Sequence, residues 1–270
     1  MRRAVHNQPM RVCLLILSCI PLSISAAQEP TRIIGGPGAG CIAGAIELPP
    51  SGAGYVTIRQ SRSSFWGAPS TIDALELLGV EARGAGLGTL YMNDISLPHG
   101  GPMAGLHASH MLGLDADVWL DVRPKPALSA AERDEVAVEP LVWPDGRRIE
   151  AQRWSAGVVR LIRLATALPG VDRVLVNPAI KRQLCQTEAD RSWLHLVRPW
   201  YGHTAHMHIH FRCPAGQAEC RDQVPPPPGD GCDASLDWWF ARLDAPPAPP
   251  GPPPRPPTLP AACAGILAGR

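Results

Sequence analysis

The sequence has no long hydrophobic run and no excess of charge of one sign. The apolar run at residues 12–20 is far shorter than the ~20 residues that a membrane-spanning helix needs. The formal net charge is +1 at pH 7, which provides neither the basic stripe of a nucleic-acid-binding protein nor a polybasic membrane patch. We therefore predict no nucleic-acid partner and no stable membrane insertion.

Three common catalytic or metal-binding motifs are also missing. The sequence contains no H-E-x-x-H, which excludes the helical zincin motif. It contains no G-x-S-x-G, which removes the nucleophile elbow of serine hydrolases. It contains no C-x-x-C pair, which disfavours a zinc site built from cysteines.

The N-terminus has the features of a secretory signal. Arg2, Arg3 and Arg11 provide positive charge before and at the start of the apolar run, and Ser25-Ala26-Ala27 offers small residues for cleavage. A retained signal anchor is the alternative. We predict a signal peptide over residues 1–27 and export across the cytoplasmic membrane; its removal would lower the formal charge from +1 to about −2.

The cysteine content fits an exported protein. Without the two in the signal, six cysteines remain, an even number that suits disulfides in an oxidising compartment. Cys213 and Cys220 are close enough to close one loop, and Cys41 and Cys263 could tie the ends together. The sequence alone does not fix the pairing.

The rest of the chain is typical of one α+β domain followed by a tail. Residues 28–240 form the predicted domain, and residues 241–270 form a proline-rich tail that ends near Cys263. Residues 70–73 resemble a capping box before a helix, and residues 158–168 have helical spacing. Residues 90–95, 114–120, 174–176 and 206–211 have strand patterns. Strands and helices do not alternate strictly, so we predict a central antiparallel sheet.

Histidines and aspartates gather in two strand-like segments. Five of the nine histidines lie between His195 and His210. On a strand, His206, His208 and His210 point to one face, and the apolar residues between them point to the other. Asp117 lies on the polar face of residues 114–120, after His107 and His110. If these strands pair, two imidazoles and a carboxylate meet, which is a donor set that suits zinc.

Other interpretations of these histidines remain open at this point. They could hold a structural or stored metal, or form a nonspecific metal-sequestering patch. Trp119, Trp200 and Tyr201 could line a substrate groove or belong to the core. The residues alone support a zinc hydrolase without naming its substrate.

A combination of motifs resembles a known family. These are GLHASHMLGLDAD at residues 105–117, VNPAIK at 176–181, VRPW at 197–200, AHMH at 205–208 and GDGC at 229–232. Together they are similar to the penicillin-insensitive murein endopeptidases of the LAS group of zinc peptidases, which includes lysostaphin-type enzymes, D-Ala-D-Ala peptidases and the hedgehog fold. The resemblance covers roughly residues 35–240 and the final cysteine.

The resemblance implies roles for particular residues. Zinc would be held by His110, Asp117 and His208, with His206 as the base or transition-state stabiliser and His203 assisting. His107 and Asp145 match accessory metal positions, although Arg148 stands where the family has a further histidine, and His210 stands where a non-histidine is usual. The implied disulfides are Cys41–Cys263, Cys185–Cys232 and Cys213–Cys220.

The resemblance also implies a function. We expect a periplasmic zinc endopeptidase that hydrolyses D-alanyl–meso-diaminopimelyl cross-links between the stem peptides of peptidoglycan and is insensitive to penicillin. A zinc D,D-carboxypeptidase or dipeptidase on the same scaffold is one alternative, and a non-catalytic zinc-binding wall protein is another. The sequence leaves the oligomeric state open between monomer and dimer.

Overall fold

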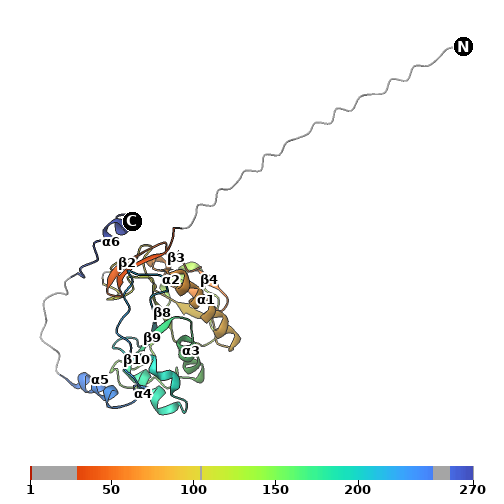
Figure 1. Cartoon of the computed structure of the whole chain (residues 1–270). Helices are drawn as coiled ribbons and strands as arrows, with labels where there is room; N and C mark the ends of the chain where they lie inside the picture. Colours follow the sequence, from red (N-terminus) through yellow and green to blue (C-terminus); the bar gives the residue numbers. More distant parts are fainter. Residues whose placement is uncertain (2–28, 104, 246–255, 270) are drawn as a thin grey trace.

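A seven-stranded sheet lies at the centre of the computed structural model, which describes residues 1, 29–103, 105–245 and 256–269 (Figure 1). The predicted signal peptide, apart from Met1, lies outside the described residues. The strand order is β10-β9-β11-β8-β7-β5-β4. Its strands are β4 (Ser51–Gly52), β5 (Tyr55–Thr57), β7 (Leu90–Met92), β8 (Asp115–Trp119), β9 (Val171–Val176), β10 (Val197–Pro199) and β11 (His206–Phe211).

The sheet confirms the α+β prediction and adds parallel pairs that the sequence did not indicate. β11 is antiparallel to both β8 and β9, whereas β10 is parallel to β9, and β5 is parallel to β7. The central sheet is therefore mixed, with the antiparallel strands where the histidines lie. Two small two-stranded sheets accompany it, β1 (Arg32–Gly36) with β2 (Ala39–Ala43), and β3 (Ile46–Glu47) with β6 (Trp66–Gly67).

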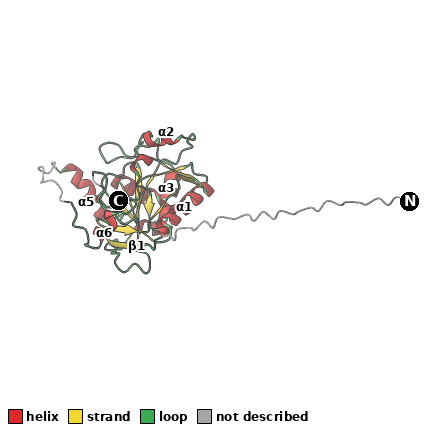
Figure 2. Ribbon diagram, turned by 90° about the horizontal axis from the view of Figure 1, so that it is seen from above, coloured by secondary structure: helices red, strands yellow, loops and turns green. Residues whose placement is uncertain are grey.

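Helices lie around the strands of the sheet (Figure 2). The described helices are α1 (Pro69–Gly84), α2 (Ala130–Glu135), α3 (Ala156–Thr166), α4 (Pro178–Thr187), α5 (Ala234–Asp244) and α6 (Cys263–Ala268), with 3-10 turns at Gln60–Arg62 and Ser192–His195. The helical spacing at residues 158–168 correctly predicted α3, whose N-cap Ser155 accepts a hydrogen bond from the Val158 N–H. The predicted helix after residues 70–73 is present as α1, but the predicted capping box is wrong. Pro69 already occupies the first turn of α1, and the N-cap residue Ala68 has no side-chain oxygen.

The predicted strand faces are confirmed. Met207, Ile209 and Phe211 of β11 are buried in the main hydrophobic core, together with Ala116 and Val118 of β8. Residues of α1 and α3 belong to the same core, so these helices pack on that face. The histidines of β11 therefore project from the opposite face, away from the helical layer.

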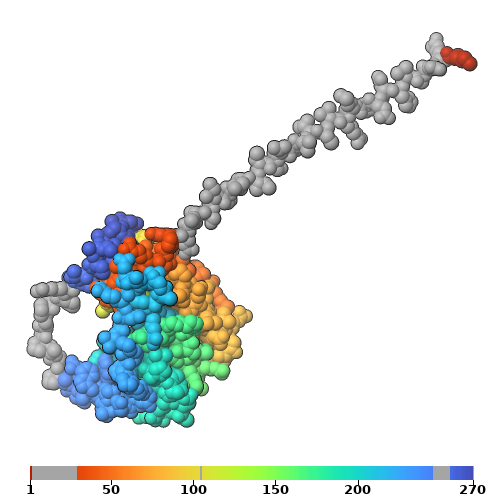
Figure 3. Space-filling view, in the orientation of Figure 1, coloured from red at the N-terminus to blue at the C-terminus, as the bar shows by residue number. Residues whose placement is uncertain are grey.

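Disulfides tie the chain ends and two loops. The structure contains Cys41–Cys263, Cys185–Cys232 and Cys213–Cys220, the pairs that the family resemblance implies. The first holds α6 against β2, so the two ends of the described fold lie side by side (Figure 3). The predicted domain boundary after residue 240 falls inside α5, and residues 246–255 of the predicted tail lie outside the described residues. Among the described helices, none is both long and apolar enough to cross a membrane.

Candidate metal centre

The pairing of β11 with β8 joins the two histidine–aspartate segments. His208 lies opposite Asp117 and His210 lies opposite Asp115 in the antiparallel register. Residues directly opposite each other in a sheet project to the same face, so four polar side chains meet above the central strands. This confirms the strand pairing that the alternating pattern suggested.

Three donor atoms form a compact triangle at this point. His110 Nε2 lies 3.1 Å from His208 Nδ1. Asp117 Oδ1 lies 3.6 Å from His110 Nε2 and 3.4 Å from His208 Nδ1. Ligands about 2.0–2.1 Å from a tetrahedral zinc stand about 3.4 Å from one another. The triangle therefore has the size of three corners of a zinc tetrahedron.

The hydrogen bonds on the far side of each imidazole set which nitrogen faces the triangle. His110 Nδ1 lies 2.9 Å from the Ile95 carbonyl oxygen, and His208 Nε2 lies 2.8 Å from Asp115 Oδ1. Because both of these partners accept, each imidazole donates outwards. Burial would lower the pKa of His208, but Asp115 and Asp117 outweigh it and raise the pKa to about 10, so without a metal ion a proton lies between the two nitrogens that face inwards. Two lone pairs 3.1 Å apart repel unless a cation or a proton lies between them.

Asp117 supports the same interpretation. It is 2% exposed, and its Oδ1 is buried without a hydrogen-bond partner. Burial alone would raise the pKa of this carboxyl, but the neighbouring His206 and His110 outweigh it and hold the pKa well below its usual range. A buried carboxylate with a free oxygen is costly unless it is paired or binds a metal, so the donor set fits a zinc ion.

Asp115 is a functional candidate that the sequence analysis missed. It is fully buried, and its Oδ1 accepts hydrogen bonds from both His208 and His210 at 2.8 Å. Its Oδ2 accepts a hydrogen bond from the His110 backbone N–H at 3.2 Å. Asp115, His208 and His210 are close enough to hold a metal themselves. Asp115 is already saturated with donors, however, so it is better suited to orient His208 than to bind an ion.

The backbone at the centre is held in an unusual conformation. His110 and His203 have φ values of 66° and 46°, in the left-handed region that non-glycine residues seldom adopt. Gly113 also has a positive φ, 67°, and an added Cβ there would lie 2.9 Å from the Gly67 Cα. The turn between His110 and β8 therefore depends on glycine and presents His110 to the strand. Such strain persists where the surrounding structure enforces it, often at functional sites.

His107 lies beside the triangle and has a partner of its own. With His110 and Asp117 it forms a second group able to hold a metal. Its Nε2 lies 2.8 Å from Asp94 Oδ2 and 3.8 Å from Asp117 Oδ2. Asp94, another residue that the sequence analysis missed, is buried and also accepts hydrogen bonds from Arg62 and Ser64.

Asp145 is not brought to this cluster. Its side chain is exposed, accepts a hydrogen bond from Arg148 at 3.0 Å, and belongs to neither metal-binding group of the described residues. The accessory position expected at Asp145 therefore has no support from the geometry. Arg148 pairs with the carboxylate instead.

His203 and His206 lie next to the triangle as neutral bases. Burial lowers the pKa of His203 to about 4, and it lowers the pKa of His206 against the attraction of Asp117. His206 Nε2 lies 3.7 Å from Asp117 Oδ2, and the His203 and His206 rings are 5.0 Å apart. His203 Nδ1 lies 2.9 Å from the Tyr201 carbonyl, which leaves its Nε2 free to accept a proton. Both imidazoles are therefore neutral near pH 7, and each keeps a lone pair that can accept a hydrogen bond.

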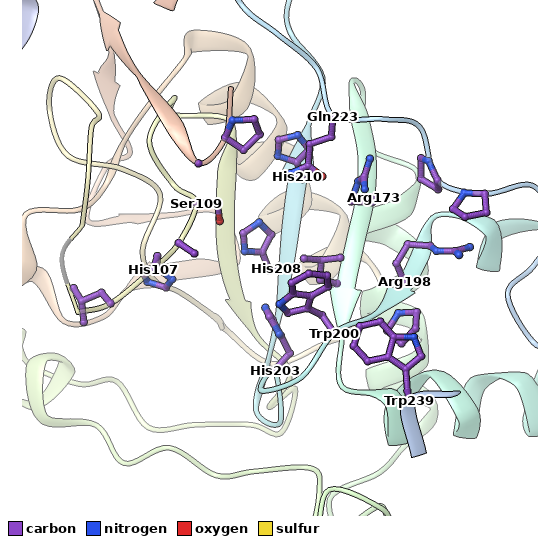
Figure 4. A pocket seen from close by; sticks show the side chains of 18 residues that line it. His107, Ser109, Arg173, Arg198, Trp200, His203, His208, His210, Gln223 and Trp239 are labelled. Carbon is purple, nitrogen blue, oxygen red and sulfur yellow. The ribbon is translucent and has the colours of Figure 1, made fainter. Parts of the chain in front are cut away.

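A cavity of about 560 Å³ opens along the histidine face (Figure 4). His203, His208 and His210 project into it from β11 and the turn before it, with His107 on one side and Trp200 and Trp239 on the other. Trp200 is 54% exposed, as expected for a rim residue. Trp119 does not lie at the rim; it is buried against Tyr91.

Comparison with known proteins gives a consistent result. A family model described as penicillin-insensitive murein endopeptidase matches residues 33–268. A protein of that name from Klebsiella pneumoniae is 40% identical over 271 residues, which cover 97% of this chain and 98% of the relative. Proteins of the same name from Yersinia enterocolitica and Haemophilus influenzae are 44% and 45% identical, covering 87% and 74% of this chain and 85% and 70% of their own lengths. The matched region includes every residue of the candidate metal centre.

Proposed function

The chain belongs to the penicillin-insensitive murein endopeptidase family, and from this membership we propose that it is a periplasmic zinc endopeptidase that hydrolyses peptide cross-links in peptidoglycan. The proposed bond joins D-alanine of one stem peptide to meso-diaminopimelate of another. The observation that carries the proposal is the triangle of His110 Nε2, His208 Nδ1 and Asp117 Oδ1, with edges of 3.1–3.6 Å, at the wall of an open cavity.

In this proposal His110, Asp117 and His208 hold the zinc and Asp115 orients His208. Three protein ligands leave a fourth position for water or substrate, as catalytic zinc sites do. A bound zinc ion would supply Lewis acidity, polarising the scissile carbonyl and making water more acidic. The triangle borders the cavity through His208, so a peptide bond in the cavity could reach it.

His206 is the proposed base. It lies on the same strand face as His208, its imidazole is neutral, and its Nε2 lies 3.7 Å from Asp117 Oδ2. It would accept a proton from the attacking water and deliver it to the departing amine. His203, whose Nε2 keeps a lone pair, would assist by accepting a hydrogen bond from His206 once His206 has taken the proton.

The proposed location is the periplasm. Three disulfides suit an oxidising compartment, and the proposed substrate lies outside the cytoplasmic membrane. We propose that residues 1–27 are the signal peptide, residues 28–240 the catalytic domain, and residues 241–270 a tail fastened by Cys263.

Digestion of defined muropeptide dimers tests this function. The zinc-loaded mature protein is incubated with dimers cross-linked through D-alanine and diaminopimelate, and the products are separated by mass spectrometry. Release of monomers supports the proposal. Release of free D-alanine without monomers would indicate the carboxypeptidase alternative, and no product from protein that retains zinc would indicate the non-catalytic alternative.

Monomer release measured with penicillin and with a chelator distinguishes the proposed zinc mechanism from that of a serine enzyme. The proposed chemistry has no serine to acylate, so penicillin should leave monomer release unchanged, whereas a chelator should abolish it. Inhibition by penicillin would contradict the proposed mechanism.

A further inference from the structure

An arginine lies in the same row of the sheet as the metal-binding triangle. Leu175 of β9 is the register partner of both His208 on β11 and Arg198 on β10. Asp117, His208, Leu175 and Arg198 therefore project to one face in a line across four strands. At about 4.8 Å per strand, the Arg198 Cα lies about 10 Å from that of His208. Arg198, Leu175 and His208 all line the cavity.

The guanidinium of Arg198 has no hydrogen-bond or ion-pair partner within 4 Å among the described residues; the Asp233 carboxylate attracts it from farther away. Its side chain is half-buried, no hydrogen bond or ion pair is made to it, and its Nη1 is buried without an acceptor. Its neighbour Arg173, in the next row, differs: it forms an ion pair with Asp172 and donates to the Val224 carbonyl at 2.6 Å. Figure 4 shows the two arginines side by side in the cavity wall. Of these two arginines, Arg198 is therefore the one without a close acceptor, and its guanidinium can bind an anion.

The surroundings hold Arg198 in place. A Cβ added to Gly231 would lie 3.1 Å from Arg198 Nη1, so the backbone of this loop closes against the guanidinium. The Cys185–Cys232 disulfide fixes the loop to α4. An arginine keeps its charge even where burial disfavours it, and leaving such a group without an acceptor is unfavourable. A planar guanidinium held in this way can bind a carboxylate through two parallel hydrogen bonds from Nε and Nη2, since only Nη1 is buried against the loop.

The proposed substrate carries such a carboxylate close to the bond that is cut. In the cross-link, the diaminopimelyl carbon that bears the scissile amide nitrogen also bears a free carboxylate. We infer that Arg198 binds this carboxylate and so selects diaminopimelyl cross-links whose acid is unmodified. The inference rests on the proposed function and adds to it a residue that determines specificity on the leaving side of the bond.

A competition between two dimers tests the inference. One dimer carries the free carboxylate beside the scissile amide, and the other carries a primary amide there; both are mixed with zinc-loaded enzyme in one tube. The ratio of their cleavage rates, read by mass spectrometry, does not depend on how much of a variant is folded. Because hydrogen bonds to a charged group contribute roughly 1.5–3 kcal/mol, we expect the wild type to prefer the acid by about 10- to 100-fold.

Variants assign the preference to Arg198. In Arg198→Gln the ratio of the two cleavage rates should fall close to one. Arg198→Lys keeps the positive charge but lacks the planar guanidinium, so its ratio should lie between those of Arg198→Gln and the wild type. Arg160→Gln is the matched control, since Arg160 is exposed on α3 against the opposite face of the sheet and its loss changes the net charge equally. It should keep the wild-type ratio.

The possible failures are distinguishable. Cleavage of both dimers at equal rates by the wild type, or an unchanged ratio in Arg198→Gln, would overturn the role of Arg198 and leave the proposed function standing. Cleavage of neither dimer by the wild type would reject the proposed function and this inference with it.

Discussion

Replacing Asp115 by Asn should weaken zinc binding without removing any proposed ligand. Asp115 accepts three hydrogen bonds, from His208 Nε2, His210 Nδ1 and the His110 backbone N–H. An Asn side chain has one oxygen, so one of its two positions becomes a donor. If the amide nitrogen faces the imidazoles, His208 must change tautomer and place a proton on Nδ1; if it faces His110, two donors meet at the turn that presents that ligand.

The size of this effect follows from the contacts. A buried hydrogen bond to a charged group contributes about 1.5–3 kcal/mol, and loss of a partner behind a metal ligand commonly lowers metal affinity about 10- to 100-fold. We therefore expect the dissociation constant for zinc to rise about 10- to 100-fold in Asp115→Asn, measured by competition with a chromogenic chelator at constant pH.

The control for this variant is Asp121→Asn. Asp121 follows β8 and pairs with Arg123 at the surface. Its replacement by Asn removes the same charge as Asp115→Asn but no contact with the candidate metal centre. Its zinc affinity should match that of the wild type. If Asp115→Asn also binds zinc as tightly as the wild type, with an unchanged near-ultraviolet circular dichroism spectrum, Asp115 does not orient His208 and the tautomer argument is wrong.

Three further predictions concern catalysis and stability. His206→Ala should abolish monomer release yet retain zinc in the chelator assay; loss of zinc would show that His206 is a ligand. Replacing both Cys185 and Cys232 by Ser should lower the free energy of unfolding by about 4 kcal/mol, because their disulfide closes a loop of 47 residues; a change under about 1 kcal/mol would contradict this. Burial lowers the pKa of Lys181 to about 7 from 10.5, so above pH 7 the folded protein binds fewer protons than the unfolded chain, and its stability should rise with pH. From pH 7.5 to pH 9.5, the free energy of unfolding of the wild type should rise by about 1–2 kcal/mol relative to that of Lys181→Met, as measured by denaturant titration. If the two proteins differ in this free energy by the same amount at both pH values, the pKa of Lys181 is not lowered.

Features set by local periodicity could be predicted from the sequence. The alternation in residues 114–120 and 206–211 fixes which side chains share a face, because the period of two belongs to any strand. The faces of β8 and β11 and the helix α3 were therefore predicted correctly. The predicted strand at residues 90–95 ends early at Met92, after which Asn93 and Asp94 contact β8 through single backbone bonds.

Features that depend on distant pairing could not be predicted in this way. Asp94 reaches His107 only because the chain after β7 turns beside β8, and no periodic pattern marks it. Arg198 faces the cavity because β10 pairs with β9, and that pairing joins segments without a shared local signal. Asp115 lies on the predicted polar face, but its hydrogen bonds to two histidines require the register of β11. Strand register is a property of the whole sheet, and it decides these contacts.

The most direct test of the central claim is a zinc titration of the metal-free protein. Monomer release from the cross-linked dimer is measured as zinc is added in steps to a known concentration of chain. One centre formed by His110, Asp117 and His208 predicts that activity rises linearly and reaches its plateau at one zinc ion per chain. Full activity without zinc, or a plateau reached only at two ions per chain, would contradict the account.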